Sequence, residues 1–472
     1  MHPRSFLLLA GFALALMAAG EVGANDPEFS YTTEGKVWAV AISADGEYIA
    51  AGSDDDNVYL FERDSNTPLW DYTTGDDVRS VAISSDGEYI AAGSLDSKVY
   101  LFNRDDGTPF RSYGTGHDVV SVAISADGKY IAAVSNDNKV YLFDRDSSTP
   151  LWSYDTGNWV WSVTISTDGE YIAAGSHRNI YLFNKDSGTP LWDYTTGSEV
   201  NSIAISADGE YIAAGSADAK VHLFDKDSST PLWSYDTGED VYSVAISADG
   251  EYIAAGSNDR NIYLFDKDGS TPLWSYTTGG VYSVAISADG EYIVAGCDWQ
   301  SSKVYLFDKD SNTPLWSYET GNAVRSVTIS ADGKYIAAGS EDYKVYMFDK
   351  NMPPTAHIDS ITPSSPRFDD EVTFSGSGSD SDGDVTAYQW KSSIDGELST
   401  VANFSVTGLG AGTHTISFRV QDNDGGWSGW DTAVLVVNSN VPPVATIDSI
   451  IPSPARFVNE DVTFSGTGLD SD

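Results

Sequence analysis

The sequence predicts an all-β protein made of a long repeated region followed by smaller β domains. The main observation is an Asp-Gly pair, followed by Glu or Lys and then Tyr, that recurs eight times, with its Asp at 45, 86, 127, 168, 208, 249, 289 and 332. Each unit also holds four short runs rich in β-branched and aromatic residues, separated by turn-forming residues. After Lys350 the repeat stops and the chain becomes rich in Pro and Ser.

Each repeat is expected to form one antiparallel four-stranded meander. In the second unit the strands are "VRSVAIS", "YIAAGS", "KVYLFNRD" and "PFRSYGT", and their tight connections favour neighbouring antiparallel strands. Both faces carry apolar or small residues, so each sheet must stack on its neighbours. Repeats of about 40 residues that stack in this way are typical of a β-propeller. A solenoid is the alternative, but it would need polar end caps, for which the sequence shows no candidate.

The two ends of the repeated region predict how the ring closes. Eight copies of the first three strands begin at Val37, Val78, Val119, Val160, Val200, Val241, Val281 and Val324. Only seven fourth strands follow them, from "PLWDYTT" at 68–74 to "PLWSYET" at 314–320, whereas "FSYTTE" at 29–34 has the fourth-strand pattern but precedes the first unit. We therefore predict an eight-bladed propeller over 29–350, closed by an N-terminal strand that removes an exposed sheet edge.

The units resemble two propeller families. "VRSVAISSDGEYIAAGSLDSKVYLF" is similar to the WD repeat, and "VYLFDRDSSTPLWSYDTG" at 140–157 resembles the pyrroloquinoline-quinone-type (quinoprotein-like) repeat. The second resemblance implies that the outer-strand Trp docks adjacent blades. The chain departs from both patterns, since the Gly-His and closing Trp-Asp pairs of WD repeats are absent. Its single cysteine, Cys297, excludes the adjacent Cys pair of quinone-dependent dehydrogenases, and no cofactor is predicted.

The remainder of the chain is predicted to form a linker at 351–357, a β-sandwich at 358–438 and part of a second one at 442–472. "SGSDSDGDVTAYQW" at 377–390 and "GTHTISFRVQDNDGG" at 412–426 resemble the PKD (polycystic kidney disease) domain, an immunoglobulin-like module of secreted and cell-surface proteins. The PKD-like sequence pattern begins again at 442, and Asp472 follows after about a third of a copy. We expect the natural protein to be longer, or the gene to be truncated.

The N-terminus and the charge predict export and exclude some partners. Residues 1–24 combine Arg4, an apolar run from Phe6 to Ala19 and a small residue at Ala24, which is a signal-peptide pattern. We therefore expect a secreted or cell-surface protein, with no further stretch long enough to cross a bilayer. A net charge of −44 disfavours nucleic acid and anionic membranes as partners. Cys297 is interpreted as a small buried strand residue.

Comparison among the repeats points to one face as the candidate binding site. In a meander, the first-to-second and third-to-fourth turns share one face, and these turns barely vary here. The turns on the other face vary, and they carry side-chain types enriched at binding hot spots. The candidate ligand-binding residues are Trp38, Arg79, Trp159, Trp161, Tyr242, Tyr282, Trp299 and Arg325. The alternative is that these residues plug the channel mouth or have drifted in permissive loops.

Acidic turns offer one candidate cation site. Asp380, Asp382 and Asp384 in "SDSDGDV" have alternate spacing that suits Ca²⁺, but we favour a plain acidic turn because so short a run supplies few ligands. No catalytic residue is predicted, since the histidines show no ligand spacing and no nucleophile motif is found.

These features predict a non-catalytic binding or adhesion protein whose propeller, expected to be monomeric, recognises an extracellular protein or glycan. The sandwich modules would act as spacers. The alternatives are a quinoprotein-like or glycan-active extracellular enzyme, and an envelope assembly scaffold.

Overall fold

The computed structural model describes residues 26–380, 383–423, 425–439, 444–451 and 463–469. The predicted signal peptide lies outside these residues. The chain divides into two compact units, Met1–Lys350 and Asn351–Asp472. Strands are the only regular elements in the described ranges, and no helix there is long and apolar enough to cross a bilayer. The predicted all-β class is confirmed.

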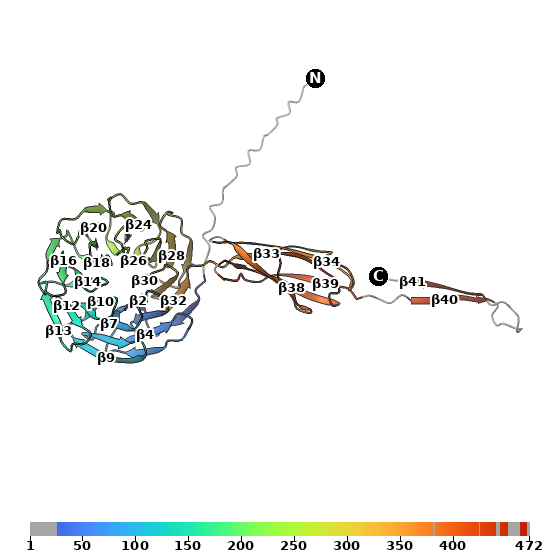
Figure 1. Cartoon of the computed structure of the whole chain (residues 1–472), viewed down its shortest axis with the longest axis horizontal. Helices are drawn as coiled ribbons and strands as arrows, with labels where there is room; N and C mark the ends of the chain where they lie inside the picture. Colours follow the sequence, from blue (N-terminus) through green and yellow to red (C-terminus); the bar gives the residue numbers. More distant parts are fainter. Residues whose placement is uncertain (1–25, 381–382, 424, 440–443, 452–462, 470–472) are drawn as a thin grey trace, which may run out of the picture. The chain divides into compact units, whose positions relative to one another are not determined.

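The first unit contains eight antiparallel four-stranded sheets, or blades, arranged around a centre (Figure 1). Each inner strand begins at the Val that the repeat pattern indicated. Blades one to four are β2 (Val37–Ile42), β3 (Tyr48–Ser53), β4 (Asn57–Glu62) and β5 (Trp70–Thr73); β6 (Val78–Ile83), β7 (Tyr89–Ser94), β8 (Lys98–Asn103) and β9 (Asp106–Gly114); β10 (Val119–Ile124), β11 (Tyr130–Ser135), β12 (Lys139–Asp144) and β13 (Pro150–Asp155); β14 (Val160–Ile165), β15 (Tyr171–Ser176), β16 (Asn179–Asn184) and β17 (Trp192–Thr195).

The remaining four blades repeat this order, except that the last takes its outer strand from the start of the described chain. They are β18 (Val200–Ile205), β19 (Tyr211–Ser216), β20 (Lys220–Asp225) and β21 (Trp233–Asp236); β22 (Val241–Ile246), β23 (Tyr252–Ser257), β24 (Asn261–Asp266) and β25 (Trp274–Thr277); β26 (Val281–Ile286), β27 (Tyr292–Cys297), β28 (Lys303–Asp308) and β29 (Trp316–Glu319); β30 (Val324–Ile329), β31 (Tyr335–Ser340), β32 (Lys344–Asp349) and β1 (Phe29–Thr32).

The repeated Asp-Gly pair builds the turn between the first two strands of each blade. In the first blade, the Ser43 hydroxyl and the Glu47 N–H both donate to the Asp45 carboxylate, at 2.6 and 3.0 Å. Gly46 has a φ of 75°, and a Cβ there would lie 2.3 Å from the Tyr335 ring of the eighth blade. Only glycine satisfies both conditions. The Asp-Gly pair is therefore structural, as its ordinary turn chemistry predicted.

Bonds between blades run around the whole repeated region. β1 pairs with β32, with Phe29 opposite Met347 and Tyr31 opposite Val345. Next to the Asp-Gly turns, one backbone N–H in each blade donates to a carbonyl of the next blade at 2.9–3.1 Å. This series starts with Ala44 donating to Ser85, and it returns to its start when Ala331 donates to Ala44. The first and eighth blades thus share the same backbone hydrogen bond as the other neighbouring pairs.

The core of the first unit lies between neighbouring blades. Each cluster takes the buried aliphatic residues of one blade and packs them on the inner-strand valines and the third-strand Phe of the next. Phe61 and Phe102 are examples of these fully buried rings. The small residues of the "YIAAGS" strands allow neighbouring blades to approach closely. A Cβ on Gly52, for example, would lie 2.6 Å from Val78 of the second blade.

The second unit contains two sheets that share one core. The sheet orders are β33-β34-β37 and β36-β35-β38-β39, and Phe374, Trp390 and Phe418 form the centre of the core. β33 begins inside the segment 351–357 that the composition marked as a linker. The bounds are β33 (Thr355–Thr362), β34 (Val372–Ser379), β35 (Val385–Ser392), β36 (Gly396–Ser399), β37 (Asn403–Val406), β38 (Gly412–Asp422) and β39 (Asp431–Val437), followed by the separate pair β40 (Val444–Ile451) and β41 (Thr463–Leu469).

Candidate functional site

The varied turns lie together at one end of the blades, which we call the upper face. It consists of the first residues of the inner strands, the second-to-third turns and the fourth-to-first loops. Backbone bonds join these segments in the first blade, where Asp54 N–H donates to Lys36 O at 2.9 Å and Thr74 N–H donates to Asp56 O at 2.8 Å. The nearly invariant turns lie at the opposite end, the lower face.

Five of the predicted binding residues form one connected group on the upper face, the arginine–aromatic cluster. It runs through five consecutive blades and contains Arg79, Trp38, Arg325, Tyr282 and Tyr242. The guanidinium groups of Arg79 and Arg325 lie 4.1 and 4.8 Å from the centre of the Trp38 ring. Arg325 also lies 4.3 Å from the Tyr282 ring, which meets Tyr242 edge-on at 5.6 Å. These cation–π contacts fix the aromatic rings and the positively charged guanidinium groups next to one another.

Carboxylates next to the cluster form ion pairs with its arginines. Glu341 is paired with Arg325 and also with Lys36, the latter at 3.0 Å. Although burial acts to raise it, the pKa of Glu341 lies below its ordinary value because both cations donate hydrogen bonds to it. Arg79 pairs with Asp77 at 3.0 Å, and the Trp38 indole N–H donates to Asp54. Glu341 was not singled out from the sequence, since only the ring of blades brings it close to Lys36.

The other predicted residues lie outside this cluster. Trp159 is 52% exposed and meets Trp161 edge-on at 5.6 Å. The indole nitrogen of Trp161 is buried and, in the described part of the chain, has no hydrogen-bond partner. Trp299 lies in the turn between β27 and β28 and is 69% exposed. The candidates therefore divide into one five-residue cluster, one Trp pair and one separate Trp.

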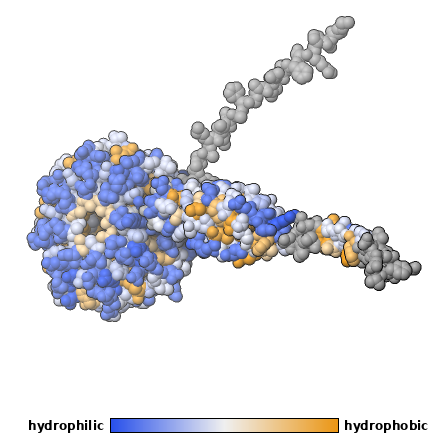
Figure 2. Space-filling view, turned by 45° about the vertical axis from the view of Figure 1, so that its right-hand side comes forward, coloured by the Kyte–Doolittle hydropathy of each residue, from blue (hydrophilic) through white to orange (hydrophobic). Residues whose placement is uncertain are grey.

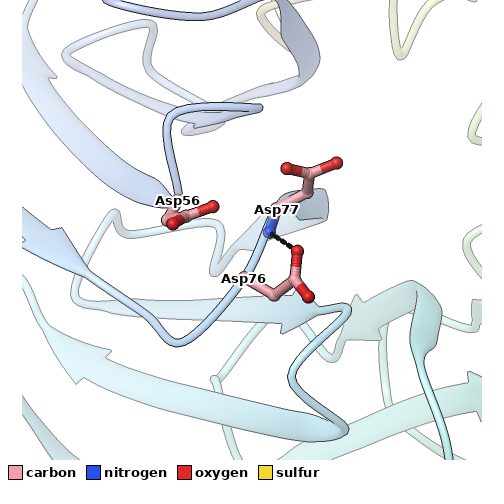
Figure 3. Close-up of side chains that lie close together, drawn as sticks. All are labelled: Asp56, Asp76 and Asp77. Atoms are coloured by element: carbon pink, nitrogen blue, oxygen red, sulfur yellow. Dashed lines mark hydrogen bonds between the residues drawn. The ribbon is translucent and has the colours of Figure 1, made fainter.

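Three carboxylates on the upper face lie close together, as Figure 3 shows. Ligand atoms of Asp56, Asp76 and Asp77 lie within 4.8 Å of one another, and the Asp77 N–H donates to the Asp76 carboxylate at 2.9 Å. Burial and the neighbouring carboxylates raise the pKa values of Asp56 and Asp77. Exposed acidic groups gather readily on so acidic a chain, and the cluster by itself does not define a cation site.

The predicted cation site in the second unit is only partly described. Asp380 is half-buried and Asp384 is exposed, while Asp382 lies outside the described residues. The backbone N–H of Asp384 donates to the Asn423 side chain at 2.7 Å, which places an amide oxygen beside the acidic turn. Calcium at this turn stays a prediction.

The centre of the ring is hollow and apolar. Figure 2 shows a central opening bordered by weakly hydrophobic residues, with a hydrophilic surface around them. Toward the lower face a cavity of about 290 Å³ is lined by the last isoleucines of the inner strands, among them Ile42, Ile83 and Ile205. Such a lining supplies no titratable group for acid–base chemistry.

Comparison with known proteins supports the propeller. The family model described as "Outer membrane protein assembly factor BamB" matches residues 112–318 and 217–352. The model described as "WD domain, G-beta repeat" matches residues 27–62 and 67–103. No match was found among curated proteins.

Solved structures with the same fold share little sequence with the chain. The computationally designed Ika8 protein is 14% identical, with a TM-score of 0.59, and the match covers 69% of this chain and 99% of that one. Chaetomium thermophilum Sqt1, solved with the N-terminus of ribosomal protein L10, is 18% identical with a TM-score of 0.61, covering 69% and 100%. These identities show the fold alone. Because the matches to the first family model together span residues 112–352, slightly more than half of the 472 residues, the chain belongs to the propeller-repeat family that this model describes.

Proposed function

We propose that the chain is an exported, non-catalytic binding protein whose closed propeller recognises a protein or glycan through the upper face. One observation supports this above the others: the varied residues of five separate repeats form the arginine–aromatic cluster. The ring brings the same inner-strand position of neighbouring blades together, and here that position carries large Trp, Tyr and Arg side chains that contact one another. Trp, Tyr and Arg are also the side chains that contribute most at binding interfaces.

The second unit and the N-terminus indicate where the proposed binding would take place. The PKD-like resemblance favours a spacer role for the two-sheet unit, and the predicted signal peptide favours the cell exterior. Families of propeller repeats commonly serve protein interaction, and the fold by itself specifies no ligand.

A substitution on the upper face tests the proposal. The triple variant Trp38→Ala/Trp161→Ala/Arg325→Ala is compared with the full chain on an array of glycans and surface proteins. The matched control is Leu191→Ala/Leu232→Ala/Leu273→Ala, which removes three half-exposed leucines that precede outer strands. Binding that the upper-face variant loses at least tenfold and the control retains would support the proposal. Equal binding by both folded variants would refute it.

An assembly scaffold is the second candidate, favoured by the description of the matching family as an outer membrane assembly factor. A scaffold would hold one partner in fixed proportion, whereas an adhesin would bind a surface ligand reversibly. Cross-linking in the native host followed by affinity purification distinguishes them, because recovery of one stoichiometric partner supports the scaffold.

A further inference from the structure

Seven of the eight contacts between neighbouring blades share one hydrogen bond near the lower face. A side chain at a fixed position of the fourth strand donates to the carbonyl of the residue that follows the third strand of the next blade. In six contacts the donor is an indole N–H, at 2.7–3.2 Å; the pairs are Trp70–Arg104, Trp152–Lys185, Trp192–Lys226, Trp233–Lys267, Trp274–Lys309 and Trp316–Lys350. In the seventh, Arg111 donates to the carbonyls of Arg145 and Asp146, at 3.4 and 3.2 Å.

The contact between the eighth and first blades lacks this bond. Phe29 lies opposite Met347, just as Trp70 lies opposite Leu60 in the first blade, so Phe29 occupies the Trp position. Phe has no N–H to donate. The corresponding acceptor is the carbonyl of Arg63, and in the described part of the chain no side chain donates to it. The third-to-fourth turn that precedes each Trp is also absent here, because β1 does not follow β32 along the chain.

A cavity of about 610 Å³ lies at this junction, and we call it the seam pocket. Its lining includes Glu28, Phe29, Arg63, Asp64, Tyr335 and Asp349. The wall therefore combines three carboxylates with two aromatic rings. The Arg63 guanidinium is already engaged, since it pairs with Glu47 at 2.9 Å and Asp64 at 3.2 Å and lies 4.3 Å from the Tyr335 ring.

The charges of the seam pocket favour a cationic hydrogen-bond donor. Burial raises the pKa of Glu28, and the carboxylates of Asp349 and Asp64 raise it further. An opposite charge placed beside Glu28 would favour its ionised form and offset this repulsion. Arg111 shows which group fits, because its guanidinium donates to the two carbonyls that correspond to those of Arg63 and Asp64. A guanidinium also presents several N–H donors in one plane, whereas an ammonium is a compact, strongly hydrated charge.

We propose that the seam pocket binds a guanidinium group, supplied by an arginine side chain of a partner protein or by a free guanidinium compound. The group donates to the Arg63 carbonyl and pairs with the carboxylates of Glu28 and Asp64, in the place that an indole or Arg111 takes in the other contacts. The seam pocket lies toward the lower face, so it is separate from the arginine–aromatic cluster. Either site can therefore fail its test without affecting the other.

Calorimetric titration of the full chain tests this proposal. The probes are Nα-acetyl-arginine methylamide, ethylguanidinium and a Gly-Gly-Arg-Gly-Gly peptide, with the lysine and tryptophan amides as comparisons. We expect the arginine amide to bind with a dissociation constant of about 1 mM or tighter and the lysine amide at least tenfold more weakly. Tighter binding of the peptide than of ethylguanidinium would identify a protein arginine as the source; equal binding would identify a free compound.

Three variants locate the binding. Phe29→Trp restores the indole of the other contacts and should abolish binding without lowering the melting temperature. Glu28→Gln/Asp64→Asn should weaken it at least tenfold, whereas Asp105→Asn, the same turn position one blade later, should not change it. The proposal is overturned if the arginine amide fails to saturate, if the lysine or tryptophan amide binds as well, or if Phe29→Trp binds as well as the original chain.

Discussion

Truncation of Phe29 should destabilise the first unit more than truncation of the exposed phenylalanine in another outer strand, Phe110. The Phe29 side chain is 9% exposed and lies 5.9 Å from the Phe61 ring of the first blade. Phe→Ala in a core typically costs 3–5 kcal/mol. The lower end applies here because the seam pocket adjoins the ring, so we expect about 3 kcal/mol. For a unit of this size that corresponds to a fall in melting temperature of roughly 4 °C.

The matched control is Phe110→Ala, also in an outer strand but 44% exposed. It should cost less than about 1 kcal/mol. Scanning calorimetry of both variants measures the difference, and hydrogen exchange in β32 reports whether its outer edge opens. Deleting residues 25–34 should have a larger effect, since Tyr31 and its contact with Phe61 at 5.2 Å are then lost as well. The reasoning would be wrong if Phe29→Ala melted with the original chain and β32 kept its protection.

Three further predictions follow from single residues. Burial raises the pKa of the fully buried Cys297 thiol to about 12, so iodoacetamide at pH 8 should label it only in denaturant; rapid labelling of the folded chain would contradict this. Burial acts to raise the pKa of Asp218, but the His222 side chain 3.6 Å away and the Gly197 N–H lower it from 3.8 to about 2. A lowered folded-state pKa contributes stability that is present above pH 4 and lost as the pH falls toward 2. The free energy of unfolding of Asp218→Asn should therefore fall less between pH 4 and pH 2 than that of the original chain, as urea denaturation at each pH measures. An unchanged pH dependence would count against this assignment. Seven blades have a serine hydroxyl that accepts an N–H of the next blade, as Ser80 does from Val122 at 3.0 Å, whereas Ala39 cannot; Ala39→Ser should add about 0.5–1 kcal/mol in urea denaturation, and a loss of stability would show that the site has no room for the hydroxyl.

The repeat pattern alone determined the blades, because strands and turns are read from local residues. The strands that are apolar or small on both faces, the Asp-Gly turns and their spacing all repeat within about 40 residues, so each copy predicts the same local structure. The observed first residues of the inner strands follow directly from this pattern. The start of β33 inside the expected linker shows its limit, since Pro and Ser composition marks a boundary only approximately.

Only the tertiary structure decided which of the varied residues contact one another. Trp38 lies between Arg79 and Arg325, and the second of these pairs with Glu341 in the eighth blade. The sequence placed all eight candidates on one face but could not separate the cluster from Trp299. All of them lie in varied segments of that face, and the sequence does not show which of these segments contact one another. The seam pocket was likewise invisible, because "FSYTTE" reads as an ordinary fourth strand until its Phe is placed opposite Met347. Strands and turns depend on residues that are close together in the sequence, so local patterns predict them. Side-chain contacts between blades depend on the ring, which brings distant repeats together.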